Sequence, residues 1–105
     1  MKTRTESDIV KECMAVLAAD NIFHWRQNNN AVKGRAFIGL KGVPDILCLI
    51  KNGKLMGVEV KTLIGKQSPE QIEFERNCEK RGAIYLLVRS AHELENILND
   101  MGDLL

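Results

Sequence analysis

Two apolar segments, residues 43–50 and 54–61, lie on either side of the tripeptide Lys51-Asn52-Gly53. Apolar runs of this length around a short loop that contains Asn-Gly are typical of a β-hairpin. Successive side chains of a strand leave opposite faces, so the length of the loop decides which side chains meet across the hairpin. This hairpin therefore constrains the fold more than any other feature of the chain.

The hairpin loop also decides whether three polar residues can act together. A loop of two residues would send the Asp45 side chain to the face opposite Glu59. A loop of three residues, as a type I turn that ends in a left-handed glycine, places Asp45 directly opposite Glu59. Lys61 follows Glu59 by two positions, so its side chain leaves the same face. The three-residue loop thus gathers two carboxylates and a lysine in one patch.

Helix and strand signals alternate along the rest of the chain. Apolar periodicity and capping sequences predict helices at 6–19, 69–81 and 91–101, and β-forming residues predict strands at 22–27 and 83–88. The expected capping boxes pair Thr5 with Asp8, Ser68 with Gln71 and Ser90 with Glu93. The order αβββαβα predicts an α/β fold, a mixed sheet flanked by helices. A chain of 105 residues has room for a single domain, which we expect to span 1–105.

The charge is unevenly distributed, although the net charge of the chain is only +1. Residues 21–69 hold eight basic side chains and two acidic ones, a net of +6, and the two acids are Asp45 and Glu59. The polar loop 28–42 has no acid. Basic side chains in such a loop are suited to phosphate contacts, which makes nucleic acid the expected partner. The candidates in this loop are Lys33, Arg35 and Lys41.

Two carboxylates directly opposite one another repel unless a cation lies between them. Asp45 and Glu59 therefore predict a metal site, and a small number of oxygen ligands suits Mg²⁺, with Mn²⁺ as a substitute. The metal would polarise a phosphate, while Lys61 would orient a water molecule or neutralise developing charge. The alternative is a surface Glu/Lys pair with an unrelated aspartate.

The segment Gly42-Val43-Pro44-Asp45, followed by thirteen residues and then Glu59-Val60-Lys61, resembles the PD-(D/E)XK nuclease superfamily. More narrowly, residues 41–71 resemble the VRR-NUC family. The resemblance extends back to Glu6 on the first helix and to residues 26–28 at the end of the strand before the loop. It therefore covers most of the chain.

The resemblance implies a restriction-endonuclease-like fold with a metal-dependent catalytic centre. In that centre Asp45 and Glu59 bind the metal, the carbonyl of Val60 adds a ligand, and Lys61 serves the nucleophilic water. Glu6 matches the acid of the family's first helix and joins the expected catalytic and metal-binding residues; a helix-dipole role is its alternative.

Gln71 matches the catalytic glutamine of the family's second helix, although its position also fits a capping box. The resemblance and the charge pattern together predict a set of residues that contact DNA. These are Arg26, Asn28, Lys33, Arg35, Lys41, Lys66 and Gln67.

The implied function is that of a metal-dependent, structure-selective endonuclease that cuts branched DNA such as Holliday junctions and works as a homodimer. Candidate interface residues are Phe37, Ile38, Leu40, Leu104 and Leu105. One alternative is a non-catalytic DNA-binding module of the same fold. Another is a small interaction protein such as an antitoxin.

Neither a secretory signal nor a membrane-spanning segment is expected, which predicts a cytoplasmic protein of a bacterial or phage-infected cell. Cys13, Cys48 and Cys78 are an odd number without a CxxC pair, so we expect buried, reduced thiols. His24 is expected to be a packed or rim histidine, and Trp25 a core residue, with stacking on a base as its alternative.

Overall fold

The computed structural model describes residues 3–27 and 39–105, and its elements follow in the order αβββαβα that the sequence predicts. The elements are α1 (Glu6–Ala19), β1 (Phe23–Arg26), β2 (Ile46–Ile50), β3 (Lys54–Val60), α2 (Pro69–Arg81), β4 (Ile84–Val88) and α3 (Ala91–Met101). Short 3-10 turns, η1 (Lys51–Gly53) and η2 (Gly102–Leu104), follow β2 and α3.

The helices begin where the capping sequences place them. Full capping boxes form at the first two helices, between Thr5 and Asp8 at α1 and between Ser68 and Gln71 at α2. At α3 the Ser90 hydroxyl accepts a hydrogen bond from the Glu93 amide, which is one half of the predicted box. These bonds satisfy amide groups that have no partner inside the helix, and so they fix the first turn.

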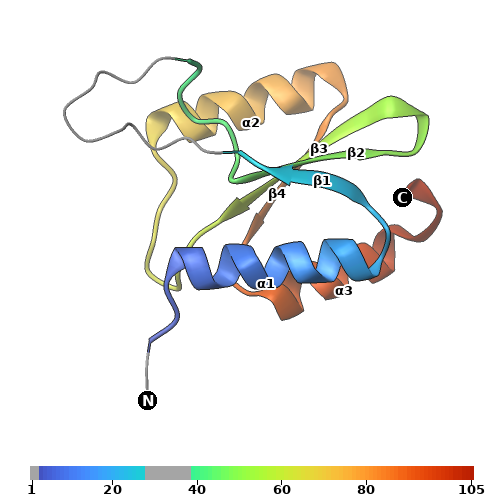
Figure 1. Ribbon diagram of the computed structural model, residues 1–105. Coiled ribbons are helices and arrows are strands. Elements are labelled where there is room, and N and C mark those ends of the chain that lie inside the picture. The colour runs from blue at the N-terminus through green and yellow to red at the C-terminus, as the bar shows by residue number, and fades with distance from the viewer. Residues whose placement is uncertain (1–2, 28–38) are drawn as a thin grey trace.

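The four strands form one mixed sheet in the order β1-β2-β3-β4. The first three strands are antiparallel neighbours, whereas β4 pairs parallel to β3 after the crossover through α2. Helices α1 and α3 pack together on one face of this sheet, and α2 packs on β4 from the other face (Figure 1). The predicted α/β architecture with a mixed, flanked sheet is confirmed.

The core lies between the sheet and the pair α1 and α3. Alternate residues of β2, namely Ile46, Cys48 and Ile50, are buried there, while Leu49 on the opposite face is exposed. The apolar side chains that α1 and α3 add to this core are Ile9, Val10, Cys13, Leu17, Leu94 and Leu98. Alternate side chains of β2 are thus buried against α1 and α3, and the side chains between them face the α2 side of the sheet.

Trp25 is not a core residue, so this prediction was wrong. It lies on β1 at the edge of the sheet, pairs with Leu47 and is exposed. Its ring meets Phe23 edge-on at 6.0 Å. The cause is topological, because α2 packs on β4 at the other edge of the sheet. His24 faces the opposite side, half-buried, with Nδ1 2.8 Å from the carbonyl oxygen of Ile22, as expected of a rim histidine.

Strand β2 begins at Ile46, three residues later than the predicted start at residue 43. The preceding Pro44 has no amide hydrogen to contribute to a strand pair. It packs instead on Gly57 of β3, where an added Cβ would lie 2.7 Å from the Pro44 Cγ. This close packing holds the residues before β2 against β3.

The three cysteines are free and buried, as predicted. Burial raises the pKa of the Cys13 thiol to about 11 and that of Cys48 to about 12, so both remain protonated near neutral pH. Protonated thiols are poor nucleophiles and poor metal ligands. Within residues 3–27 and 39–105, no helix is long and apolar enough to cross a membrane.

Candidate active site

The loop between β2 and β3 has the three-residue length that the predicted site requires. Ile50 pairs with Lys54 across residues 51–53, as expected. The predicted type I turn was wrong, because Asn52 as well as Gly53 adopts positive φ, at 66° and 72°, a conformation that asparagine and glycine tolerate best. The register of the whole hairpin follows from this turn.

That register brings Asp45 and Glu59 to the same end of the hairpin. Ile46 pairs with Val58. Asp45 precedes Ile46 and Glu59 follows Val58, so these two acids are neighbours across the two strands. The Asp45 carboxylate reaches across β3 and accepts a hydrogen bond from the Val60 amide at 2.8 Å. The aspartate is therefore held in place by the strand that carries the glutamate.

Glu59 is the buried acid of the described residues, with only 2% of its surface exposed. Its Oε2 accepts a hydrogen bond from Gln71 Nε2 at 3.1 Å and lies 3.5 Å from Nζ of Lys61. Its Oε1 is also buried, yet no hydrogen-bond partner for it is found among the described residues. Burial, and then the carboxylate of Asp45, raise the pKa of Glu59 to about 8, and Lys61 offsets only part of this effect.

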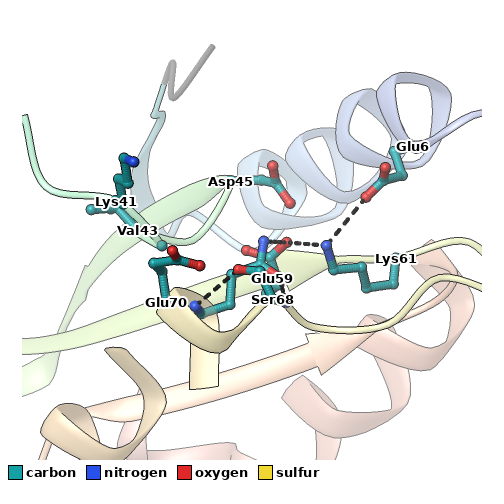
Figure 2. A pocket seen from close by; sticks show the side chains of 10 residues that line it. Glu6, Lys41, Val43, Asp45, Glu59, Lys61, Ser68 and Glu70 are labelled. Carbon is teal, nitrogen blue, oxygen red and sulfur yellow. Dashed lines mark hydrogen bonds and ion pairs between the residues drawn. The ribbon is translucent and has the colours of Figure 1, made fainter. Parts of the chain in front are cut away.

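Lys61 follows β3 directly and joins this centre to the first helix. Its Nζ lies 3.9 Å from Oε1 of Glu6, in the first turn of α1. The Glu6 carboxylate is about half exposed, whereas Lys61 is largely covered. Figure 2 shows the carboxylates of Glu6, Asp45 and Glu59 turned toward the space around the lysine ammonium group. Glu6 therefore reaches the site from the end of the apolar face of α1.

Gln71 closes the predicted capping box and also contacts the buried acid, and its catalytic role stays a prediction. Its Oε1 accepts a hydrogen bond from the Ser68 amide at 2.8 Å, which closes the capping box of α2. Its Nε2 donates to Glu59 at the same time. One side chain thus connects the helix start with the buried acid.

These side chains line a polar pocket of about 390 Å³. Besides the residues already described, its wall includes Lys41, Gly42, Val43 and Glu70. Gly42 has φ +86°, and a Cβ there would lie 2.3 Å from the Glu70 carbonyl oxygen, so glycine allows this segment to reach the start of α2. Glu70 is not among the residues predicted for the site, although its place in the first turn of a capped helix is a usable signal.

The predicted DNA-contacting residues fall into three groups. Lys41 and Lys66 are exposed, and Arg26 is exposed with Nη2 3.5 Å from the Ser7 hydroxyl oxygen. Gln67 is used inside the protein, because its Nε2 donates to Glu75 Oε1 and to the Tyr85 hydroxyl, both at 3.2 Å. Three of the predicted contacts lie outside the described residues, namely Asn28, Lys33 and Arg35, as do Phe37 and Ile38 of the proposed interface.

Arg89, directly after β4, is a further residue near the site that the sequence did not predict. Its Nη1 donates to the carbonyl oxygen of Thr62 and, at 2.9 Å, to that of Gly65. The guanidinium group therefore holds the loop that follows Lys61. No local sequence signal marks this contact, because it joins residues more than twenty positions apart.

The donor set fits a hard divalent cation that keeps part of its water shell. Within the described parts of the chain, no three His, Cys, Asp or Glu side chains form a cluster that could enclose a metal ion. Two carboxylates do converge, and the unpartnered Oε1 of Glu59 beside Asp45 is the environment that a cation would stabilise. Mg²⁺ is commonly bound by one or two carboxylates, with water and phosphate completing its shell.

Searches with the sequence found neither a matching family model nor a matching curated protein. A search with the structure found a solved structure described as a VRR_NUC domain. The two share 24% sequence identity with a TM-score of 0.66, over 90% of this chain and 94% of that chain. This chain therefore has the restriction-endonuclease-like fold of a VRR_NUC domain.

Proposed function

We propose that this protein is a metal-dependent endonuclease of the VRR-NUC family that hydrolyses phosphodiester bonds in branched DNA. The observation that carries the proposal is the environment of Glu59. A buried carboxylate with an unpartnered oxygen lies beside a second carboxylate and 3.5 Å from a lysine ammonium group, in an open polar pocket. Such an arrangement costs folding stability, which is typical of a functional site.

Asp45, Glu59 and the backbone carbonyl of Val60 would hold Mg²⁺, or Mn²⁺ in its place. When bound, the metal supplies Lewis acidity to the scissile phosphate and to a water molecule. Asp45 is oriented for this role by its bond from the Val60 amide, and Glu59 by its bond from Gln71. These hydrogen bonds from the Val60 amide and from Gln71 hold the two carboxylates in position before metal and substrate bind.

Lys61 would position the attacking water and neutralise charge on the phosphate. Its ammonium group lies between Glu59 and Glu6, at 3.5 and 3.9 Å, so it is directed from two sides. The Glu6 carboxylate can steer this lysine or join the metal shell through water. Both functions place Glu6 in the catalytic centre.

Basic residues around the pocket would bind the DNA backbone. Lys41 lines the pocket, Lys66 lies on the loop after Lys61, and Arg26 ends β1. Asn28, Lys33 and Arg35 belong to the proposed set as well, and so does Gln67, which would have to exchange its bonds to Glu75 and Tyr85 for a contact with DNA. Phosphate contacts of this kind position a duplex without reading its sequence, as a structure-selective nuclease requires.

Branched substrates such as Holliday junctions require two cuts, and a homodimer would supply two sites related by two-fold symmetry. Of the proposed interface residues, Leu40 and Leu104 are exposed, Leu105 is half-buried and packs against the core, and Phe37 and Ile38 lie outside the described residues. Light scattering across a concentration series, together with mapping of paired cuts on a four-way junction, tests this assembly. A monomer that cuts linear DNA equally well would contradict it. We place the activity in the cytoplasm of a bacterial or phage-infected cell.

The direct test of the function is a gel assay of DNA binding and cleavage, with and without Mg²⁺, on linear, flap and four-way DNA. Wild-type protein should cleave branched DNA when Mg²⁺ is present, and Glu59→Gln should bind without cleaving. Binding by wild type with no turnover under any metal would identify a non-catalytic DNA-binding module instead. Absence of both binding and cleavage would favour an interaction protein.

A further inference from the structure

Immediately after Lys61, the chain makes a tight turn that carries two large apolar side chains. The Gly65 amide donates to the Thr62 carbonyl oxygen at 3.1 Å, which makes Leu63 and Ile64 the central residues of the turn. Their exposed fractions are 85% and 90%, the highest of the large exposed hydrophobic residues in the described chain. The most exposed apolar surface of the described chain therefore lies next to the candidate catalytic lysine.

The turn itself does not require these residue types. Central turn positions favour Gly, Pro, Asn, Asp and Ser, each for a backbone reason that neither leucine nor isoleucine meets. Two side chains of this size in water also forgo the free energy that burial would provide. The exposure of Leu63 and Ile64 is thus explained by a contact with another molecule, which the isolated domain does not make.

The turn is held firmly at both ends. Arg89 donates to the carbonyl oxygens of Thr62 and Gly65, the two residues that bound it. The apolar pair is consequently presented at a fixed position relative to Lys61. It also forms part of the wall of an apolar hollow of about 900 Å³, which continues onto Ile9 of α1 and Ala91 of α3.

The charge around the turn favours DNA as the occupant of this surface. Residues 60–69 contain no acid, and Lys61 and Lys66 lie on either side of the apolar pair. Arg4 and Glu12 both line the hollow and are paired with each other, so together they add no net charge to it. Lys61 is largely covered and paired with Glu6 and Glu59, so the exposed Lys66 is the flanking charge that a ligand can reach. An apolar tip beside an exposed lysine suits a ligand with apolar base faces inside a phosphate backbone.

We propose that Leu63 and Ile64 form an apolar wedge that packs against unstacked bases at the branch point of the DNA. This inference rests on the proposed nuclease function and names the element that selects the substrate. In a linear duplex the bases are stacked, and opening a step for the wedge costs free energy. At a branch point the bases are already partly unstacked, so less free energy is needed to insert the wedge. The wedge therefore binds branched DNA better than linear DNA.

The experiment compares Leu63→Ser/Ile64→Ser with wild type in cleavage of four-way and linear DNA. Serine suits turn positions, so the backbone should be retained, which circular dichroism and thermal melting check. We expect the rate on four-way DNA to fall at least about tenfold, on the scale of burying one large aliphatic side chain, and the slow rate on linear DNA to remain. Leu63→Met/Ile64→Met, which keeps the surface apolar, should restore cleavage of four-way DNA.

A binding measurement separates this proposal from the catalytic one. In a Glu59→Gln background, four-way DNA with 2-aminopurine at the branch point should gain fluorescence on binding, and the serine pair should abolish that gain. Leu49→Thr, a matched loss of an exposed leucine on β2, should change neither readout. If wild type cleaves branched DNA but the serine pair leaves both rate and fluorescence unchanged, the wedge is wrong and the nuclease stands.

The remaining outcomes are also decisive. If wild type cleaves no DNA while the fluorescence gain still depends on the apolar pair, the wedge stands without the nuclease. If the serine pair lowers the molecular mass in solution and its cleavage defect disappears at high protein concentration, the pair contacts a second copy of the chain. That last result would overturn the assignment to DNA.

Discussion

The side-chain amide of Gln71 donates to the carboxylate of Glu59 over 3.1 Å while its oxygen caps the helix on which it sits. Glu59 belongs to β3 and Gln71 to the first turn of α2, so the hydrogen bond joins the two elements that flank the loop 61–68. Helix capping and orientation of the buried acid are consequently coupled. A substitution at this position changes both.

Two substitutions separate these roles. Gln71→Ala should lower the free energy of unfolding by about 1 kcal/mol, because the bond from the Ser68 amide is lost while the Ser68 hydroxyl still caps the helix, and it should also reduce cleavage. Gln71→Glu keeps an oxygen for the Ser68 amide but removes the donor to Glu59, so it should fold and cleave at least about tenfold more slowly. Urea denaturation and cleavage rates check both. Ser90→Ala, which removes the cap of α3, should cost similar stability without loss of activity, and an equal loss of activity would contradict the assignment.

The central residues have a simple mutational signature. Asp45→Asn, Glu59→Gln and Lys61→Ala should each abolish cleavage, because each removes a proposed metal ligand or the group that serves the water. All three should retain the fold and DNA binding, since none removes an apolar core side chain. Gel-shift and cleavage assays on the same samples measure this, and wild-type turnover by any of the three would disprove the site.

Stability of the metal-free protein should fall as pH rises. Folding raises the pKa of Glu59 from 4.5 to about 8, so the folded state holds this proton more tightly than the unfolded state does. The resulting stabilisation is complete below 4.5 and is lost progressively up to about 8, by at most about 1.4 kcal/mol per pH unit. Denaturation in chelator across this range measures the slope. Glu59→Gln should flatten it, and an unchanged slope in that variant would show that another group is responsible.

Metal should reverse this loss. Mg²⁺ or Mn²⁺ should support cleavage and raise the melting temperature at pH 8, because a cation stabilises the two facing carboxylates and binds only the folded state. Ca²⁺ should support binding with little turnover, since its geometry and acidity differ. Thermal melts of wild type and Glu59→Gln, with and without metal, give a readout independent of activity. Cleavage in excess chelator would rule out metal dependence.

The contact between Pro44 and Gly57 makes a prediction about the backbone next to Asp45. Gly57→Ala would bring a Cβ within 2.7 Å of the Pro44 Cγ, so we expect a cost of about 1–3 kcal/mol and slower cleavage as Asp45 is displaced. Pro44→Ala removes the obstructing ring. The loss in free energy of unfolding should therefore be smaller for Pro44→Ala/Gly57→Ala than the sum of the losses in the two single variants. A loss equal to that sum would show that the contact between Pro44 and Gly57 can relax freely.

Helix boundaries and the hairpin that carries Asp45 and Glu59 could be predicted because their determinants are local. Thr5 and Ser68, with partners three residues on, mark helix starts that the structure places at the predicted residues. The three-residue turn likewise fixed the pairing of Ile50 with Lys54. Asp45 and Glu59 were identified because they are the only acids in a basic segment, a pattern that needs no tertiary information.

What escaped prediction depends on which elements pack together. Trp25 is a large aromatic residue of the kind often found in a core, but its burial depends on whether a helix covers the β1 edge of the sheet. Arg89 and Gln67 form contacts across the fold that no nearby residue signals. The start of β2 was misplaced because Pro44 packs on Gly57 of the neighbouring strand. In each case the deciding partner is distant in sequence.

The three-residue connection between β2 and β3 has a consequence for how this sequence can evolve. Surface turns are ordinarily where chains gain and lose residues most freely. Here a single insertion or deletion at residues 51–53 would invert the parity of the hairpin and exchange its buried and exposed rows. The buried core row and the facing pair of Asp45 and Glu59 would be lost together. The length of an exposed turn is thus tied to the placement of the proposed catalytic residues Asp45 and Glu59, each six positions from the nearest residue of the turn.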